Sequence, residues 1–147
     1  MRVRRDVLDA IAGHARRDAP LECCGLLVGT GSEILEAVAA RNVADEPHRR
    51  YEVSPEDHFA QIRRCRVLPP REGSPLSVVG VYHSHPHSAP LPSPTDREQA
   101  FGEFLYVIAG PATDALEIRA YQLEHDQFVA VPLDVGSDPI SRSVSRP

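Results

Sequence analysis

The sequence predicts a single α/β domain built from short strands and a few helices. Three observations support this class: apolar residues recur at helical spacing near the N-terminus, short valine-rich runs fill the later part of the chain, and turn residues separate them. A chain of 147 residues, 41% hydrophobic and 25% charged, fits one globular domain. At this length folding buries roughly 68–70% of the surface that the unfolded chain exposes, so the fold needs neither disulfides nor a structural metal.

The N-terminal third predicts a helix followed by a hairpin. Residues 3–17 carry apolar side chains at helical spacing between charged ones, and Ala19-Pro20 ends this amphipathic helix. Two short apolar runs, 25–29 and 33–39, flank a glycine-containing turn and predict a pair of antiparallel strands.

A capping signal marks the second helix. After a short strand expected at 51–53, Ser54 and Pro55 supply a cap and a first-turn proline, and the helix should run to about residue 67. The segment 76–83 is rich in valine and alternates poorly, which favours a strand buried on both faces in the middle of a sheet.

The remaining chain predicts one more helix, three strands and a tail. The helix is expected at 95–101, the strands at 103–109, 116–122 and 127–132, and the turns between strands at 110–111 and 124–126. From residue 134 onward the composition has no apolar period. We therefore expect residues 1–133 to form the domain and residues 134–147 to be a disordered tail.

Charge and cysteine content exclude several classes of partner. A net charge of −5 with a pI near 5.8 is the wrong sign for binding phosphates, so we expect no nucleic acid partner. No apolar run approaches the ~20 residues that a membrane span requires, so we expect no membrane partner either. The three cysteines are odd in number, and a disulfide between neighbouring Cys23 and Cys24 would be strained, which favours a reducing, cytoplasmic compartment.

The segment His83-Ser84-His85-Pro86, at the end of the predicted central strand, carries the main chemical signal. Side chains at i and i+2 of an extended chain point to the same face about 7 Å apart, so both imidazoles can converge on one ion. Asp96 follows eleven residues after His85 and can supply a third ligand. Two histidines, one aspartate and a water form a catalytic zinc site, because the fourth position is open.

Structural alternatives exist for the same residues. Histidines in a loop are often only exposed, and Ser93-Pro94-Thr95-Asp96 is by itself a helix capping box. The two interpretations of Asp96 compete, because a coordinating carboxylate has less freedom to cap its own helix. Local sequence alone slightly favours the structural alternative.

Glu22 favours the catalytic interpretation. It lies between apolar residues just before a predicted buried strand, and zinc-dependent hydrolysis needs a nearby carboxylate to accept a proton from water. An upstream glutamate, His-Ser-His-Pro, six residues (87–92) and then Ser-x-x-Asp together resemble the signature of the JAMM, or MPN-plus, metalloproteases. The resemblance covers the chain to about residue 133.

The resemblance implies a fold, a cofactor and residue roles. The fold would be an α/β domain with a mixed, largely antiparallel curved sheet flanked by helices. His83, His85 and Asp96 would bind one zinc ion, Glu22 would act as general base, and Ser93 would stabilise the oxyanion. Ser84 and Pro86 would shape the ligand strand.

The resemblance also implies a substrate class. Members of the family cut peptide or isopeptide bonds, typically at the C-terminal ends of ubiquitin-like proteins. Because the chain lacks the long insertions that deubiquitinases use to grip ubiquitin chains, we expect a sulfur-carrier protein ending in Gly-Gly. Two alternatives stay open: a non-catalytic MPN-type interaction module, and a histidine-rich metal-handling protein.

The other histidines and the cysteines lack a partner motif. His87 is interpreted as a polar loop residue, and we expect four further histidines at the surface: His14, His48, His58 and His125. Cys23 and Cys24 are expected to be small buried side chains, with a role as nucleophile as the less favoured alternative. The motifs His-x-Glu and Pro-Cys-x-x-Cys of the zinc nucleoside deaminases do not occur in the sequence.

Overall fold

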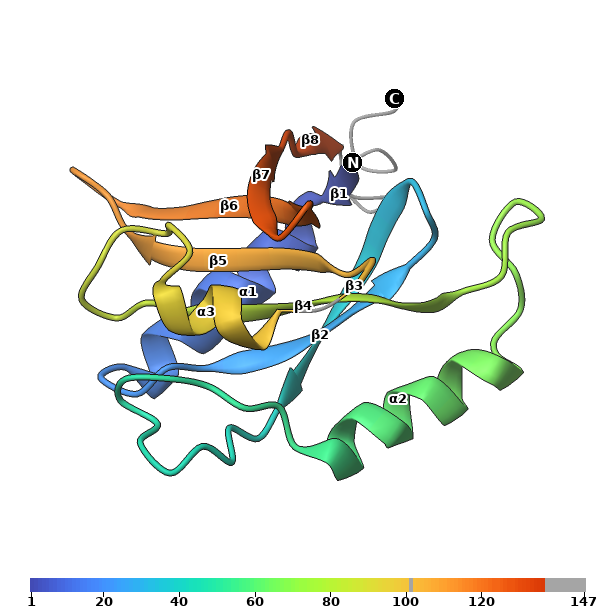
Figure 1. Ribbon diagram of the computed structural model, residues 1–147. Helices are drawn as coiled ribbons and strands as arrows, with labels where there is room; N and C mark the ends of the chain where they lie inside the picture. The colour runs from blue at the N-terminus through green and yellow to red at the C-terminus, as the bar shows by residue number, and fades with distance from the viewer. Residues whose placement is uncertain (101, 137–147) are drawn as a thin grey trace.

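The computed structural model describes residues 1–100 and 102–136. Over these residues the chain forms one eight-stranded sheet with helices on both of its faces (Figure 1). The helices are α1 (Arg5–Asp18), α2 (Pro55–Val67) and α3 (Pro94–Gln99). The strands are β1 (Arg2–Arg4), β2 (Cys24–Gly29), β3 (Glu33–Ala40), β4 (Ser77–Ser84), β5 (Leu105–Pro111), β6 (Leu116–Glu124), β7 (Gln127–Val131) and β8 (Asp134–Gly136).

The sheet is mixed, and β4 lies near its centre. Its strand order is β7-β6-β5-β4-β2-β3-β1-β8. Antiparallel pairing joins β4 to β2 and β2 to β3, and also β5 to β6 and β6 to β7. Parallel pairing joins β4 to β5 and places β1 between β3 and β8. The predicted fold class, a mixed and largely antiparallel curved sheet flanked by helices, is confirmed.

Each face of the sheet has its own apolar cluster. On one face α1 packs Val7, Ile11 and Ala15 against inward side chains of β2 and the β5–β6 pair. On the other face a smaller cluster includes Leu26, Val81, Tyr106, Ile108 and Tyr121. Because successive strand residues point to opposite faces, Tyr82 packs toward α1, whereas Val81 and His83 face α2 and α3.

The predicted hairpin, the second helix and the central strand are confirmed with small shifts of their ends. The N-terminal prediction was wrong at its start, because residues 2–4 form β1 and the helix begins at Arg5. The strand expected at 51–53 is reduced to one bridge between Asn42 and Val53.

The C-terminal half departs from the sequence prediction at two places. The chain does not turn at 110–111, since β5 continues to Pro111 before it reaches β6. Asp134–Gly136, expected to begin a disordered tail, instead form β8 and pair with β1. Residues 137–147 lie outside the described residues, so the tail stays a prediction there. The third helix ends at Gln99, and its predicted end at residue 101 also lies outside them.

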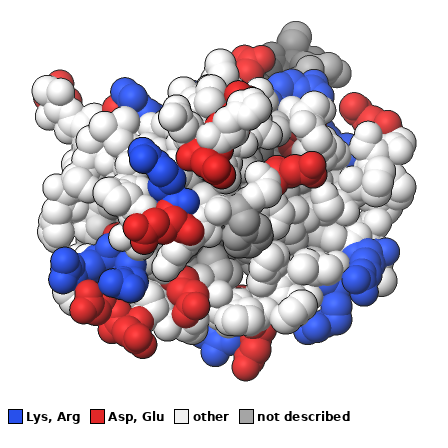
Figure 2. Space-filling view, in the orientation of Figure 1, with Lys and Arg blue, Asp and Glu red and all other residues white. Residues whose placement is uncertain are grey.

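The visible surface carries charges of both signs. Figure 2 shows arginines and acidic side chains in small groups separated by uncharged surface, without a continuous basic patch on this face. Among residues 1–100 and 102–136 no helix is long and apolar enough to cross a membrane.

Candidate metal centre

The end of β4 is held rigidly by hydrogen bonds to both neighbouring strands. Ser84 Oγ accepts a hydrogen bond from the backbone N–H of Cys23 (2.8 Å), and the Ser84 N–H donates to the Cys23 carbonyl (3.1 Å). On the other side the N–H of His85 donates to the carbonyl of Ala109 on β5 (2.8 Å). The backbone on either side of both histidines is therefore fixed.

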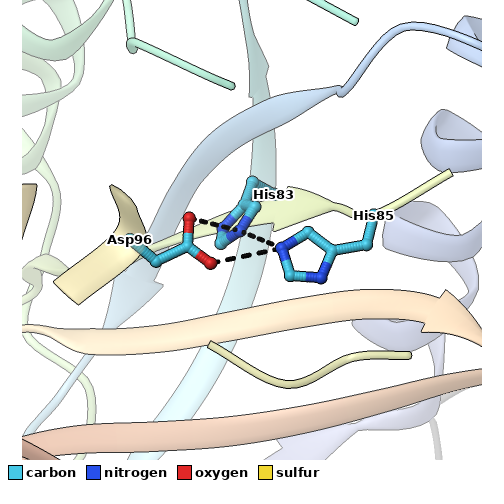
Figure 3. Close-up of side chains that lie close together, drawn as sticks. All are labelled: His83, His85 and Asp96. Carbon is cyan, nitrogen blue, oxygen red and sulfur yellow. Dashed lines mark hydrogen bonds and ion pairs between the residues drawn. The ribbon is translucent and has the colours of Figure 1, made fainter. Parts of the chain in front are cut away.

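His83, His85 and Asp96 converge on one point (Figure 3). The two Nε2 atoms lie 3.2 Å apart, His83 Nε2 lies 3.3 Å from Asp96 Oδ1, and His85 Nε2 lies 3.2 Å from Asp96 Oδ2. The side chains are 1%, 7% and 9% exposed, respectively. Three donor atoms from β4 and α3 thus face one another in a buried position.

These spacings fit a zinc ion. Zn–N and Zn–O distances of about 2.0–2.2 Å in a tetrahedron place neighbouring donors roughly 3.3–3.5 Å apart. The observed 3.2–3.3 Å separations are close to that value. Two imidazole nitrogens and one carboxylate oxygen are also a typical ligand set of catalytic zinc. The donor set therefore has both the chemistry and the spacing for one zinc ion.

The outer nitrogen of each histidine has a different environment. His85 Nδ1 donates to the carbonyl of Ala89 (2.9 Å), which leaves Nε2 of a neutral ring free to coordinate. His83 Nδ1 is buried and has no hydrogen-bond partner among the described residues. The His83 ring instead stacks on Tyr51, with centroids 4.1 Å apart and planes inclined by 17°.

Electrostatics differ between the two rings. Burial lowers the pKa of His83 and outweighs the effect of Asp96. Burial opposes protonation of His85 as well, but hydrogen bonds to Asp96 and Ala89 raise its pKa. Burial alone would raise the pKa of Asp96. The hydrogen bonds from both histidines outweigh burial, so the pKa of Asp96 is lowered. The aspartate is therefore ionised, as a ligand must be.

Asp96 serves the helix and the donor set at the same time. Its Oδ2 accepts from the backbone N–H of Ser93 (2.9 Å), and its own N–H donates to Ser93 Oγ (3.0 Å), which completes a capping box. The two interpretations that competed in the sequence are compatible, because the capping carboxylate also faces the two histidines. The Ser93 hydroxyl hydrogen is still free to donate, because Oγ acts only as an acceptor in this cap.

Glu22 is a buried carboxylate just before β2. Its side chain is 7% exposed, and Oε1 has no hydrogen-bond partner in the described part of the chain. Burial raises the pKa of Glu22 to about 7; the charge of His85 acts to lower it and that of Asp96 to raise it. A carboxyl group that titrates near neutral pH can both accept and release a proton there.

Several residues near the site carried no recognised signal in the sequence. Tyr51 and Ala89 contact the histidines from loops, and nothing local in the sequence marks them. His14 was predicted at the surface and is instead buried on the inner face of α1. The burial of His14 could have been predicted, since it follows Val7 and Ile11 at helical spacing on the apolar stripe. His87 is exposed, as are His48 and His125, and Cys23 and Cys24 are buried as predicted.

Comparison with known proteins identifies the family. A family model described as prokaryotic homologs of the JAB domain matches residues 4–124. A desampylase of Haloferax volcanii is 39% identical over 130 residues, covering 84% of this chain and 87% of the relative. A probable TtuB-protein conjugate cleaving protease of Thermus thermophilus is 36% identical, covering 88% and 80%. A CysO-cysteine peptidase of Mycobacterium tuberculosis is 29% identical, covering 90% and 89%.

Solved structures share the fold. The solution structure of a Desulfitobacterium hafniense protein superposes with a TM-score of 0.78, covering 94% of each chain at 21% identity. The chain belongs to the prokaryotic homologs of the JAB domain. The resemblance to the JAMM hydrolases is thereby confirmed, and the His83, His85 and Asp96 group provides for the single zinc ion that this family implies.

Proposed function

We propose that the protein is a zinc-dependent peptidase or isopeptidase that cuts next to the C-terminal Gly-Gly of a ubiquitin-like sulfur-carrier protein. One observation carries the chemical part: three buried donor atoms lie 3.2–3.3 Å apart, and the charges of His85 and Asp96 both act on the pKa of Glu22. That arrangement combines a metal position with a buried carboxylate that can accept a proton.

Each residue then has one task. When bound, zinc supplies Lewis acidity to the scissile carbonyl and to the attacking water. His83, His85 and Asp96 hold the ion. The Glu22 carboxylate accepts a proton from the water and later gives it to the departing amine. The Ser93 hydroxyl donates toward the carbonyl oxygen, where negative charge develops in the transition state.

The substrate class rests on the relatives and on the size of the chain. The names of three similar proteins describe a desampylase, a protease for TtuB-protein conjugates and a peptidase for CysO-cysteine. The chain is of similar length to them and has no long insertion to grip a second ubiquitin. Three free, buried cysteines are consistent with a reducing cytoplasm as the place of action.

The test uses small carriers with defined C-terminal extensions. Zinc-loaded protein is incubated with a Gly-Gly carrier extended by cysteine, with the same carrier joined to a lysine side chain, and with a ubiquitin dimer. Mass spectrometry identifies the cleaved bond. We expect cleavage directly after Gly-Gly in a carrier substrate. Cleavage of the ubiquitin dimer alone would overturn the substrate class.

The matched variant is Glu22→Gln, which keeps the shape of the side chain and removes the base. It should retain about one zinc per chain and lose about 10²–10⁴-fold in the rate of cleavage. An unchanged rate would remove Glu22 from the mechanism. Binding of the carrier without cleavage by the zinc-loaded wild type would instead point to an interaction module.

A further inference from the structure

Asn42, shortly after β3, connects three backbone segments through one side chain. Its Nδ2 donates to the carbonyls of Glu22 (3.0 Å) and Arg50 (3.1 Å), and its Oδ1 accepts from the N–H groups of Ala44 and Glu52 (3.0 Å each). These bonds use both amide hydrogens and both oxygen lone pairs. Aspartate would lack the donors and leucine would lack both kinds of group, so the position requires an amide.

The first of these segments carries Glu22. Glu22 precedes β2, so strand pairing does not fix its backbone. Its N–H donates to the carbonyl of Pro47 (2.8 Å), and its carbonyl accepts from Asn42. Both backbone polar groups of Glu22 are thus bound by the segment 42–47, which sets the position of its carboxyl group.

A second segment carries Tyr51. The Asn42 side chain binds the residue on each side of it, through the Arg50 carbonyl and the Glu52 N–H. The backbone of Val43 adds a hydrogen bond from its N–H to the Glu52 carbonyl (2.9 Å). Tyr51 is therefore held from both sides, and its ring is stacked on His83.

The His83 ring has this stack where a hydrogen bond would otherwise fix its orientation. Metal-binding histidines are commonly oriented by a hydrogen bond at the outer nitrogen, as the Ala89 carbonyl provides for His85. For His83 the described residues offer no such partner at Nδ1. A tyrosine ring parallel to the imidazole at 4.1 Å restricts the ring plane in its place.

We propose that Asn42 and Tyr51 are positioning residues for the site: Asn42 fixes the Glu22 backbone relative to the Tyr51 segment, and Tyr51 fixes the plane of the His83 ring. One amide side chain thereby couples the placement of the proton acceptor to that of a metal ligand. The kinetic part of this inference rests on the proposed function, whereas its metal-binding part does not.

Tyr51 is tested through the metal alone. Tyr51→Leu removes the aromatic stack, and Tyr51→Phe keeps it while removing the hydroxyl. Zinc affinity is measured by competition with a chelating dye, and the visible absorption spectrum is recorded with Co²⁺ in place of zinc. The leucine variant should bind zinc about 10–100-fold more weakly and show an altered cobalt spectrum. The phenylalanine variant should match the wild type in both. Wild-type affinity and spectrum in Tyr51→Leu would overturn the role of Tyr51.

The role of Asn42 is tested by measuring kcat and KM at saturating zinc, with a variant of the neighbouring residue Val43 as control. Asn42→Ala should lower kcat about 10²-fold with KM nearly unchanged, since Glu22 is misplaced while the substrate surface is kept. The kcat of Asn42→Asp should fall at least as far, because aspartate keeps the acceptor oxygen and lacks both N–H donors. Val43→Ala, at an exposed side chain, is the matched control and should behave as wild type.

The outcomes separate this inference from the proposed function. A kcat of Asn42→Ala within twofold of Val43→Ala would overturn the role of Asn42. If Asn42→Ala does not fold, as judged by circular dichroism, the kcat of Asn42→Asp decides the role of Asn42, and the Tyr51 pair decides that of Tyr51. If the wild type cleaves no carrier, the proposed function fails, and the zinc affinities and cobalt spectra of the Tyr51 variants still decide this one.

Discussion

Two clusters that contain buried histidine lie on opposite faces of the same sheet, and only one has the geometry of a metal site. On the α2 and α3 side, the Nε2 atoms of His83 and His85 point at a shared position beside Asp96. On the α1 side, His14 Nε2 lies 3.1 Å from Asp18 Oδ2, and His14 Nδ1 lies 2.7 Å from the Tyr82 hydroxyl. Each nitrogen of His14 therefore has a partner of its own.

The difference shows what identifies a metal centre. Both clusters contain buried imidazole next to a carboxylate, so residue composition alone does not separate them. Both ring nitrogens of His14 are engaged, Nε2 by the Asp18 carboxylate and Nδ1 by the Tyr82 hydroxyl, which leaves neither free for an ion. At the other cluster, the donor atoms converge and Glu22 Oε1 and His83 Nδ1 have no hydrogen-bond partner among the described residues.

The largest expected effect tests the contrast directly. His85→Ala should reduce zinc from about one per chain to little and abolish hydrolysis, because only two ligands are left. His14→Ala should keep its zinc. Elemental analysis of both variants, purified in parallel without added metal, is the measurement. Loss of zinc from the His14 variant, or full zinc in the His85 variant, would contradict the assignment of the two clusters.

The second effect concerns the buried charge of Glu22 in metal-free protein. The pKa of this group is raised from 4.5 to about 7, so the folded state loses stability as pH rises from about 4.5 to 7. Glu22→Gln removes that cost and should raise the free energy of unfolding by about 1–3 kcal/mol at pH 8. Urea unfolding of chelator-treated protein measures it.

The sign of the pH dependence is the control for this prediction. The gain in Glu22→Gln should shrink toward zero as the pH falls well below 4.5, where the carboxyl group is protonated in both the folded and the unfolded state. Glu52→Gln, at an exposed glutamate, should show no such gain at either pH. A gain that is independent of pH would rule out the buried charge as its cause.

The third effect is confined to the α1 side. Tyr82→Phe removes the hydroxyl from buried His14 and leaves Nδ1 without its partner, which should lower stability by about 1–2 kcal/mol. The zinc content and kcat should stay at the wild-type level, because the Tyr82 side chain points away from the site. Thermal unfolding measures the stability and the carrier assay measures kcat, both on the same preparation. A large loss of kcat would show that the two faces are coupled.

The smallest effect is expected at His87, an exposed histidine in the six-residue spacer of the signature. His87→Ala should change stability by less than about 0.5 kcal/mol and leave zinc content unchanged, as for an ordinary surface position. A marked loss of zinc would show that His87 acts at the centre as a third histidine, beside His83 and His85.

The sequence predicted the parts of the site whose signals are local. His83 and His85 share a face of one strand, and Asp96 follows a short loop into a helix cap, so a strand period and a capping box suffice to place them. Long-range contacts were not predictable. The pairing of residues 2–4 with residues 134–136 joins segments from opposite ends of the chain, and residues 3 and 4 also fit the helical period of α1. Asn42 likewise acts through backbone groups of distant segments.

Because Asp96 both caps α3 and faces the two histidines, zinc bound there would also stabilise the loop before α3. One carboxylate oxygen faces His85 and also accepts the Ser93 N–H that starts the helix. By thermodynamic linkage, whatever stabilises the carboxylate in this position stabilises the helix start, and the reverse also holds. A chain without zinc should therefore open its proline-rich segment 86–92 more often. Cellular proteases would then remove unloaded copies faster than loaded ones, so metal supply would set the lifetime of the enzyme as well as its activity.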